Sequence, residues 1–165
     1  MKHFMTILVL AFFLISCSST ENVKRSSFKN HQFEESHCSH TATSFNCVKV
    51  VEVYDGDTIF IDLPDQHPLF GKRMGVRIIG IDTPEIRTKN ACEKQKGQMA
   101  KKVLENIIAG ANRVDVIDVE KDKFFRILGT VLVDGKPVID DLVNARLAFP
   151  YHGEKKPTRN WCKED

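Results

Sequence analysis

The alternation of apolar and polar residues through the middle of the chain predicts a strand-rich domain. Branched and aromatic residues gather in five short stretches, each bounded by glycine, proline or acidic residues, as is typical of strands ended by turns. A loop is predicted between the second and third stretches. The five predicted strands are residues 48–54, 58–63, 74–81, 113–119 and 127–133.

Two further segments have the helical period. In residues 93–108 the apolar positions fall on one face, and Gly110 follows as a stop signal. A second, shorter helix is predicted over 138–145, directly after Pro137. This order of elements defines a β-rich α+β domain. Short strands with glycines at their bends favour an OB-fold, a five-stranded, partly open barrel with two or three helices, and a split α+β sheet fits almost as well.

The N-terminus has the layout of a secretory signal. A basic start precedes the apolar run Phe4 to Ile15, which is too short to span a bilayer as a helix. The run ends in Leu14-Ile-Ser-Cys17, which resembles the lipobox of bacterial lipoproteins. This resemblance implies a signal peptide over 1–16 and a lipid on the Cys17 thiol. An ordinary signal cleavage nearby and an uncleaved anchor are the alternatives.

The segment after Cys17 is polar and has no sustained period, so residues 17–46 are interpreted as a flexible tether. The remaining residues, 47–165, have the length of one domain. We expect an extracytoplasmic monomer, anchored by lipid to the cell envelope on its periplasmic side or at the cell surface.

Four cysteines remain once Cys17 is set aside, and they allow three pairings. An exported protein meets an oxidising compartment, which favours disulfides. We favour Cys38 with Cys47, which would close a small loop at the domain entrance, and Cys92 with Cys162, which would tie the C-terminal tail to the main helix. The competing interpretation is a zinc site at the start of the domain. Its ligands would be His37, Cys38, His40 and Cys47, but their spacing is irregular for a zinc finger.

The charge balance argues against non-specific binding of polyanions over the whole surface. The chain carries 24 basic and 22 acidic residues, for a net charge of +2, and removal of residues 1–16 takes away one lysine and no acid. Any attraction for phosphate groups must therefore be local.

Two predicted strands end in carboxylates, in Asp55-Gly-Asp-Thr58 and in the run Arg77 to Glu85. Asp57 and Asp82 could ligate a hard cation such as Ca²⁺, which prefers oxygen ligands, and the Thr83 carbonyl could be a third ligand. Each motif also has a simpler explanation. The first is a good tight turn and the start of an incomplete EF-hand loop, and Asp82-Thr-Pro-Glu85 could cap a helix.

Hydrolysis of a phosphodiester needs this set of groups. A divalent cation and guanidinium groups neutralise the charge that develops on phosphate, and a carboxylate orients or deprotonates the attacking water. Arginine suits the phosphate role because its planar fork donates two parallel hydrogen bonds. If Arg77 is half-buried in its apolar strand, it also needs a negatively charged group beside it.

In this order the motifs resemble the staphylococcal nuclease-like (thermonuclease-like) family, from about Val48 to Ala148. The resemblance includes both acidic runs, the helix after them, the Asp122 to Arg126 segment and the Asp134-Gly-Lys turn. It implies an OB-fold that binds one Ca²⁺ and cleaves DNA and RNA. The roles it implies are metal ligation by Asp57, Asp82 and Thr83, support by Asp55, water activation by Glu85, and phosphate binding by Arg77 and Arg126.

The chain departs from the family pattern in three places. Phe124-Phe125 stands where a Tyr-Gly pair is usual, the loop ahead of that segment is short, and the C-terminal tail is too short for a long closing helix. We therefore expect a calcium-dependent nuclease that hydrolyses DNA and RNA outside the cytoplasm. The alternatives are a non-catalytic OB-fold lipoprotein that binds nucleic acid, and a surface lipoprotein that serves adhesion or envelope structure.

Overall fold

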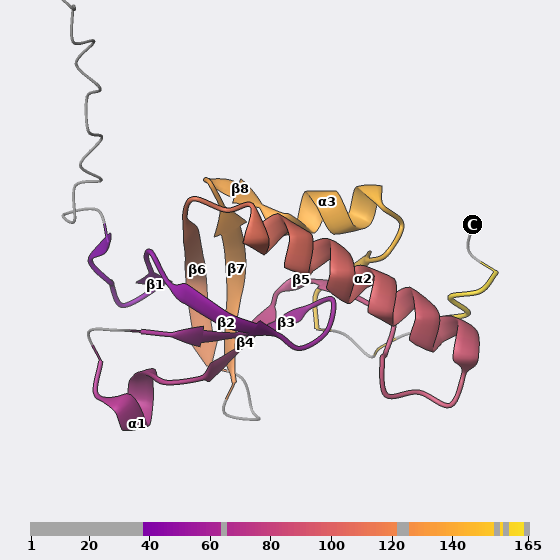
Figure 1. Ribbon diagram of the computed structural model, residues 1–165, viewed down its shortest axis with the longest axis horizontal. Helices are drawn as coiled ribbons and strands as arrows, with labels where there is room; N and C mark the ends of the chain where they lie inside the picture. Colours follow the sequence, from indigo (N-terminus) through magenta and orange to yellow (C-terminus); the bar gives the residue numbers. More distant parts are fainter. Residues whose placement is uncertain (1–37, 64–65, 122–125, 154–155, 157–158, 164–165) are drawn as a thin grey trace, which may run out of the picture. The chain divides into compact units, whose positions relative to one another are not determined.

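The fold combines a mixed β-sheet with three helices (Figure 1). The computed structural model describes residues 38–63, 66–121, 126–153, 156 and 159–163. The helices are α1 (Pro68–Gly71), α2 (Ala91–Ala109) and α3 (Val138–Asn144). Within this described part of the chain, none of the helices has the length and apolar character needed to cross a membrane.

The main sheet has the strand order β1-β6-β7-β4-β3-β2, with β8 paired to β7. Its pairs are antiparallel except for β4 and β7, which run parallel. A separate antiparallel pair joins β5 (Gly80–Asp82) to β9 (Phe149–Tyr151). The bounds of the main sheet are β1 (Ser44–Phe45), β2 (Lys49–Val53), β3 (Thr58–Asp62), β4 (Met74–Ile78), β6 (Val114–Lys121), β7 (Ile127–Val133) and β8 (Lys136–Pro137).

This architecture confirms the predicted β-rich α+β class, and the sheet is open rather than closed. A backbone hydrogen bond of 2.9 Å from Val48 N to Val114 O links the residues that precede β2 and begin β6. No ladder of paired residues joins β2 to β6 in the described part of the chain. The sheet exceeds the five predicted strands because the two-residue strands β1 and β8 extend it.

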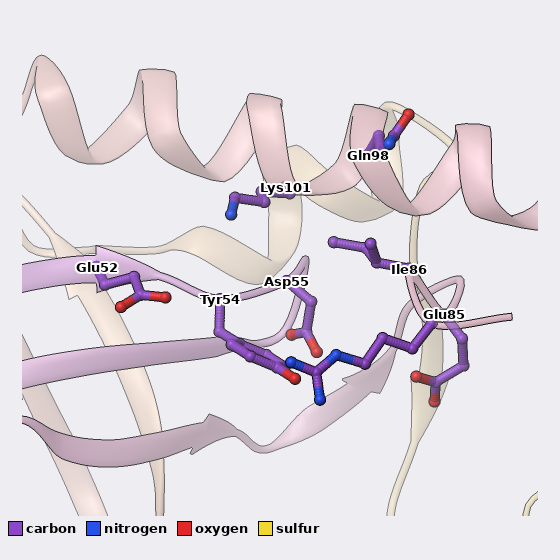
Figure 2. A pocket seen from close by; sticks show the side chains of 8 residues that line it. Glu52, Tyr54, Asp55, Glu85, Ile86, Gln98 and Lys101 are labelled. Carbon is purple, nitrogen blue, oxygen red and sulfur yellow. The ribbon is translucent and has the colours of Figure 1, made fainter.

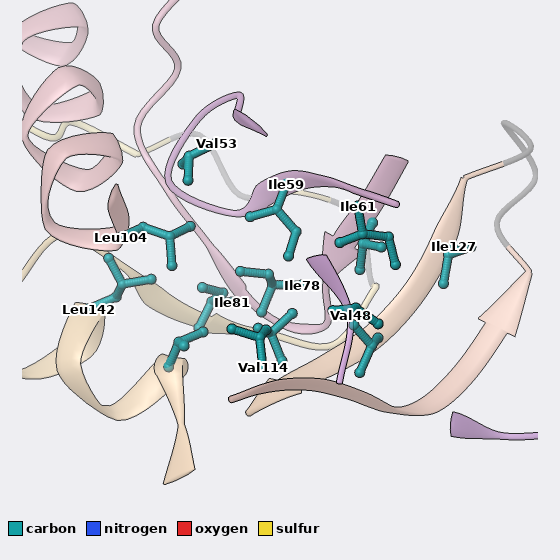
Figure 3. Packing of buried hydrophobic residues seen from close by; sticks show 14 of the residues in the cluster. Val48, Val53, Ile59, Ile61, Ile78, Ile81, Leu104, Val114, Ile127 and Leu142 are labelled. Carbon is teal, nitrogen blue, oxygen red and sulfur yellow. The ribbon is translucent and has the colours of Figure 1, made fainter. Parts of the chain in front are cut away.

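The core lies between the sheet and the two longer helices (Figure 3). Ile59 and Ile61 of β3 and Ile78 of β4 are fully buried, and Leu104 of α2 and Leu142 of α3 pack with them. Burial of one such side chain stabilises the fold by roughly 1.5 to 3 kcal/mol. Helix α2 also packs against α3 and β2, which fixes its place beside the turn that follows β2.

Local differences from the predicted elements have clear physical causes. The predicted strand 74–81 is divided into β4 and β5, because the chain turns at Ile79 and Gly80 adopts a φ of +88° that favours glycine. Helix α2 begins at Ala91, because the Asn90 side chain accepts hydrogen bonds from Cys92 N and Glu93 N. The predicted loop contains α1, whose start is capped by His67.

Both favoured disulfides are present in the structure. Cys38 is bonded to Cys47, with a Cα–Cα distance of 5.2 Å, and Cys92 is bonded to Cys162, with 6.1 Å. The cysteines of the alternative zinc site are therefore not thiolates, and His37 lies outside the described residues. Part of the segment assigned to the tether contacts the sheet, since Phe45 lies in β1 and packs against the core.

Candidate active site

The register of two strands places Asp57 beside Arg77. Thr58 in β3 lies opposite Arg77 in β4, and Ile78 N donates a 2.8 Å hydrogen bond to Asp57 O. The Asp57 side chain is buried, with 3% of the residue exposed, and its Oδ1 contacts Arg77 Nη1 in an ion pair. Strand pairing alone therefore brings one carboxylate and one guanidinium group of the predicted site together.

The Asp57 side chain also holds the loop that follows β5 through hydrogen bonds. Thr83 donates to Asp57 Oδ2 from its backbone N at 3.2 Å and from its Oγ1 at 2.9 Å. Thr58 Oγ1 donates to Asp57 Oδ1 at 3.1 Å. The Asp57 carboxylate thus joins the turn after β2 to the segment that carries Asp82 and Glu85.

A close approach of helix α2 holds the acidic turn in place. A Cβ atom added at Gly56 would lie 2.7 Å from Ala100 Cβ and 3.0 Å from Thr83 Cβ. Any larger residue at position 56 would push the turn away from either the helix or the Thr83 loop. The glycine is required here for close packing.

Asp82 is the last residue of β5 and is 2% exposed. Its Oδ1 lies 2.8 Å from Lys156 Nζ and 3.7 Å from Arg77 Nη2. Its Oδ2 is buried and has no hydrogen-bond partner among the residues that the structure describes. A buried carboxylate oxygen without a partner is costly, so this atom is a candidate ligand for a cation.

Lys156 bridges two of the acidic residues. Its Nζ lies 2.9 Å from Glu85 Oε1 as well as 2.8 Å from Asp82 Oδ1. Burial by itself lowers the pKa of Lys156, but the hydrogen bonds with Asp82 and Glu85 outweigh it and the pKa is raised. The ammonium group therefore stays charged between the two carboxylates.

Asp55 supports the turn from behind. Its Oδ1 accepts a 3.1 Å hydrogen bond from Asp57 N. Burial raises the pKa of Asp55, and the hydrogen bonds from Thr58 and the positive charges of Arg77 and Arg126 oppose this in part. Burial also lowers the pKa of Arg77, against the attraction of Asp55 and Asp82. The pKa of Asp55 and the pKa of Arg77 therefore depend on each other.

One cavity of about 400 Å³ collects all the predicted catalytic and metal-binding residues. Glu85 is the most exposed of the acids, with 56% of its side chain accessible to solvent. We call this cavity the catalytic pocket after the roles predicted for its residues. It is lined by Tyr54, Asp55, Asp57, Thr58, Arg77, Asp82, Thr83, Glu85, Arg126, Tyr151 and Lys156.

Tyr54, Thr58, Tyr151 and Lys156 also line the pocket, and the sequence analysis assigned none of them a metal-binding or catalytic role. Thr58 follows Asp57 in the acidic turn, so its adjacency was a usable signal. Tyr151 reaches the pocket because β9 pairs with β5, which places it opposite Gly80. No sequence pattern indicates that pairing. Cys17 and Phe124-Phe125 lie outside the described residues.

The pocket suits a hard divalent cation in part. The available donors are oxygens, and Asp82 Oδ2 is buried without a partner in the described chain. However, no three Asp, Glu, His or Cys side chains of the described residues converge closely enough to form a complete metal site. Asp57 and Asp82 are instead paired with Arg77 and Lys156. The residues fit a cation that would rely on backbone and solvent oxygens besides these two carboxylates.

Fold and pocket together define a small β-rich domain in which buried acids and arginines face one cavity. The family model described as "Staphylococcal nuclease homologue" matches residues 75–163, which is more than half of the chain. The chain belongs to the staphylococcal nuclease family.

Three curated proteins are similar to this chain. Endonuclease YncB of Bacillus subtilis (strain 168) is 29% identical over 92% of this chain and 80% of its own length. SPbeta prophage-derived endonuclease YokF of the same organism is 31% identical over 67% of the chain and 37% of its own length. Thermonuclease of Staphylococcus hyicus is 32% identical over 56% of the chain and 52% of its own length.

Proposed function

We propose that this protein is a calcium-dependent nuclease that hydrolyses phosphodiester bonds of DNA and RNA outside the cytoplasm. Membership of the staphylococcal nuclease family and similarity to two endonucleases and a thermonuclease support nuclease activity. The observation that carries the proposal is the catalytic pocket, in which Asp57, Asp82, Glu85, Arg77 and Arg126 line one cavity.

The two arginines would hold the phosphate. Arg77 is fixed by Asp57 and by a 3.4 Å hydrogen bond from its Nη2 to Ile81 O. Arg126 lines the same pocket, and its charge acts on both Asp55 and Arg77. Guanidinium groups held in place before the reaction stabilise the charge that develops on the phosphate oxygens.

Glu85 is the candidate for orienting or deprotonating the attacking water. Glu85 lines the catalytic pocket but takes no part in the contacts that hold Asp57 in place. Its backbone N donates a 3.4 Å hydrogen bond to Glu93 Oε1, which holds the loop near the first turn of α2. A carboxylate that is exposed and held at the pocket rim can accept a proton from water.

Asp57, Asp82 and the Thr83 carbonyl would hold the cation, with Asp55 in support. When bound, Ca²⁺ would supply positive charge that stabilises the phosphate oxygens and helps to activate water. The buried, unpartnered Asp82 Oδ2 supports this assignment.

We also propose that Cys17 carries a lipid that anchors the protein to the cell envelope. The basis is the Leu14-Ile-Ser-Cys17 sequence and the apolar run before it. Incorporation of labelled fatty acid by cells that express the protein, lost in Cys17→Ser, tests this proposal. Labelling that persists in Cys17→Ser would contradict it.

Digestion of nucleic acid by the purified protein tests the catalytic proposal. Supercoiled plasmid and single-stranded RNA are incubated with Ca²⁺ or with a chelator. We expect cutting only with Ca²⁺, and a loss of at least about a hundredfold in kcat for Glu85→Gln, since general acid–base catalysis contributes 10²–10⁴-fold. Asp140→Asn, an exposed acid in α3, is the matched control. Intact substrates under both conditions would favour a binding protein without nuclease activity.

A further inference from the structure

A second cavity of about 500 Å³ shares a wall with the catalytic pocket. It lies between the end of β2, the loop after β5 and helix α2, and Tyr54, Asp55 and Glu85 line both cavities. Figure 2 shows Tyr54 and Asp55 below α2, with Lys101 and Gln98 projecting from that helix. A substrate strand that leaves the catalytic pocket on this side would therefore enter the second cavity.

Two neighbouring aromatic rings, each with a guanidinium group against it, form a row that begins at this cavity with Arg87 and Tyr54. Arg87 Cζ lies 5.1 Å from the centre of the Tyr54 ring, and the Tyr54 and Phe60 rings meet edge to face with centroids 6.1 Å apart. Arg73 Cζ lies 4.4 Å from the centre of the Phe60 ring. We call these four residues, Arg87, Tyr54, Phe60 and Arg73, the aromatic–arginine row.

The row reaches toward the catalytic pocket at two points. Tyr54 lines that pocket directly. A Cβ atom added at Gly75 would lie 3.5 Å from Phe60 Cε1 and 3.9 Å from Arg126 Cγ, so Phe60 and Arg126 flank the same glycine. The row is thus a surface that continues from the proposed phosphate site.

The charges along the row leave Arg87 available to a ligand. Glu52 lines the second cavity but is paired with Arg73 through a 2.5 Å contact between Oε2 and Nη1. Arg87 is exposed, and no acidic side chain of the described residues forms an ion pair with it. Lys101 adds a second positive charge at the cavity, 3.9 Å from Glu105 Oε1.

We propose that the aromatic–arginine row and the second cavity bind the unpaired nucleotides that flank the bond to be cut. This inference rests on the proposed nuclease function. Aromatic and guanidinium planes stack on unpaired bases, and cationic side chains follow the phosphates. Bases inside a duplex are stacked on each other and do not present their faces. The row therefore selects single-stranded DNA or RNA over a duplex.

Binding without cleavage tests the inference directly. The purified protein is titrated, in the presence of a chelator, into fluorescein-labelled dT12 and into a labelled 12-base-pair duplex, with anisotropy as the readout. We expect Arg87→Ala and Tyr54→Leu to weaken binding of dT12 by about five- to tenfold or more, the range expected for the loss of base stacking. Duplex binding should change by less than about twofold.

Matched variants separate stacking from charge. Lys89→Ala removes the same charge two positions away and does not touch the second cavity, so dT12 binding should hardly change. Arg87→Lys keeps the charge but loses the planar group, and it should lie between wild type and Arg87→Ala. Equal losses for Arg87→Ala and Lys89→Ala, or equal losses on single strand and duplex, would overturn the proposal. Melting curves confirm that each variant is folded.

Cleavage kinetics distinguish failure of this inference from failure of the proposed function. With Ca²⁺, we expect Arg87→Ala to raise KM for a single-stranded oligonucleotide while leaving kcat nearly unchanged. If wild type cuts both the single strand and the duplex, and Arg87→Ala has the same KM as wild type, the row is not a substrate site. If wild type cuts neither substrate, the nuclease proposal fails, and the chelator titrations still decide whether the row binds single strands.

Discussion

At the residue scale, the most unusual feature is a lysine placed between an acid that we assign to the cation and an acid that we assign to water activation. Lys156 Nζ contacts both Asp82 Oδ1 and Glu85 Oε1, and 46% of its side chain is exposed. A cation that ligates Asp82 must compete with this ammonium group. The same contact holds Glu85 close to Asp82, so Lys156 acts on both the proposed metal site and the candidate base.

We predict that Lys156→Met tightens calcium binding. Loss of the competing charge should lower the Kd for Ca²⁺ by about 1.4- to fivefold, which corresponds to the 0.2–1 kcal/mol typical of partly exposed ion pairs. Isothermal titration calorimetry of the metal-free protein measures this change. Lys163→Met, an exposed lysine in the same tail, should leave the Kd unchanged. Weaker calcium binding in Lys156→Met would show that the lysine supports the site.

Substitution of an acidic residue and substitution of an arginine in the pocket should affect calcium binding and kcat differently. Asp82→Asn removes a charged ligand, so we predict weaker Ca²⁺ binding by at least about tenfold. Arg126→Ala keeps the ligands and removes positive charge near the phosphate, so we predict a nearly unchanged Kd for Ca²⁺ and a kcat lower by about a hundredfold. Calorimetry and initial rates on both variants check this. The same pattern of losses in the two variants would refute the separate roles.

At the element scale, helix α2 is the platform for the acidic loops. Its start is capped by Asn90, and Glu93 in its first turn accepts hydrogen bonds from Glu85 N at 3.4 Å and Thr88 Oγ1 at 3.0 Å. Further along the helix, Ala100 packs against the acidic turn at Gly56. One helix therefore positions both carboxylate-bearing segments.

We predict that Asn90→Ala destabilises the domain by about 1 kcal/mol, because two backbone N–H groups lose their cap. The melting temperature should fall by about 4 °C, as measured by circular dichroism. Asn106→Ala is the control, since Asn106 is exposed near the other end of the same helix and alanine has the higher helix propensity. A loss in Asn106→Ala equal to that in Asn90→Ala would rule out the cap as the cause.

At the scale of the whole molecule, the parts that the sequence predicted are those fixed by local pattern. The acids at the ends of two apolar strands indicated the turn that carries Asp57 and the run that carries Asp82. The pairing of β3 with β4 then brings Asp57 to Arg77. The division into β4 and β5 was missed, because a glycine within a branched run does not reveal its φ.

The parts that the sequence did not predict depend on long-range contacts. Lys156 is 74 positions from Asp82 and reaches the site only through the tail that follows the β5–β9 pair. Phe45 lies in a polar segment with no strand period, and its place is set by β6. The aromatic–arginine row likewise joins residues from four separate segments, so only the folded chain shows it.

The Cys92–Cys162 disulfide holds the C-terminal tail, and its loss should destabilise the domain more than loss of the Cys38–Cys47 disulfide. Cys92–Cys162 closes a loop with a sequence separation of 70, whereas Cys38–Cys47 closes one of 9. Chain-entropy arguments give roughly 4.5 and 2.5 kcal/mol for loops of these sizes. We predict that Cys92→Ala/Cys162→Ala lowers the free energy of unfolding by more than Cys38→Ala/Cys47→Ala does, as measured by urea denaturation.

The Cys92–Cys162 disulfide also affects the site, because the segment before Cys162 carries Lys156. The same segment carries the buried Trp161, whose ring centroid lies 5.1 Å from that of Phe149 in β9. Without the bridge, Lys156 should leave Asp82 and Glu85 more often. Calcium binding should then tighten in Cys92→Ala/Cys162→Ala, as in Lys156→Met, although the fold is weaker. If the double variant instead binds Ca²⁺ more weakly while still folded, the tail completes the metal site and does not compete with it.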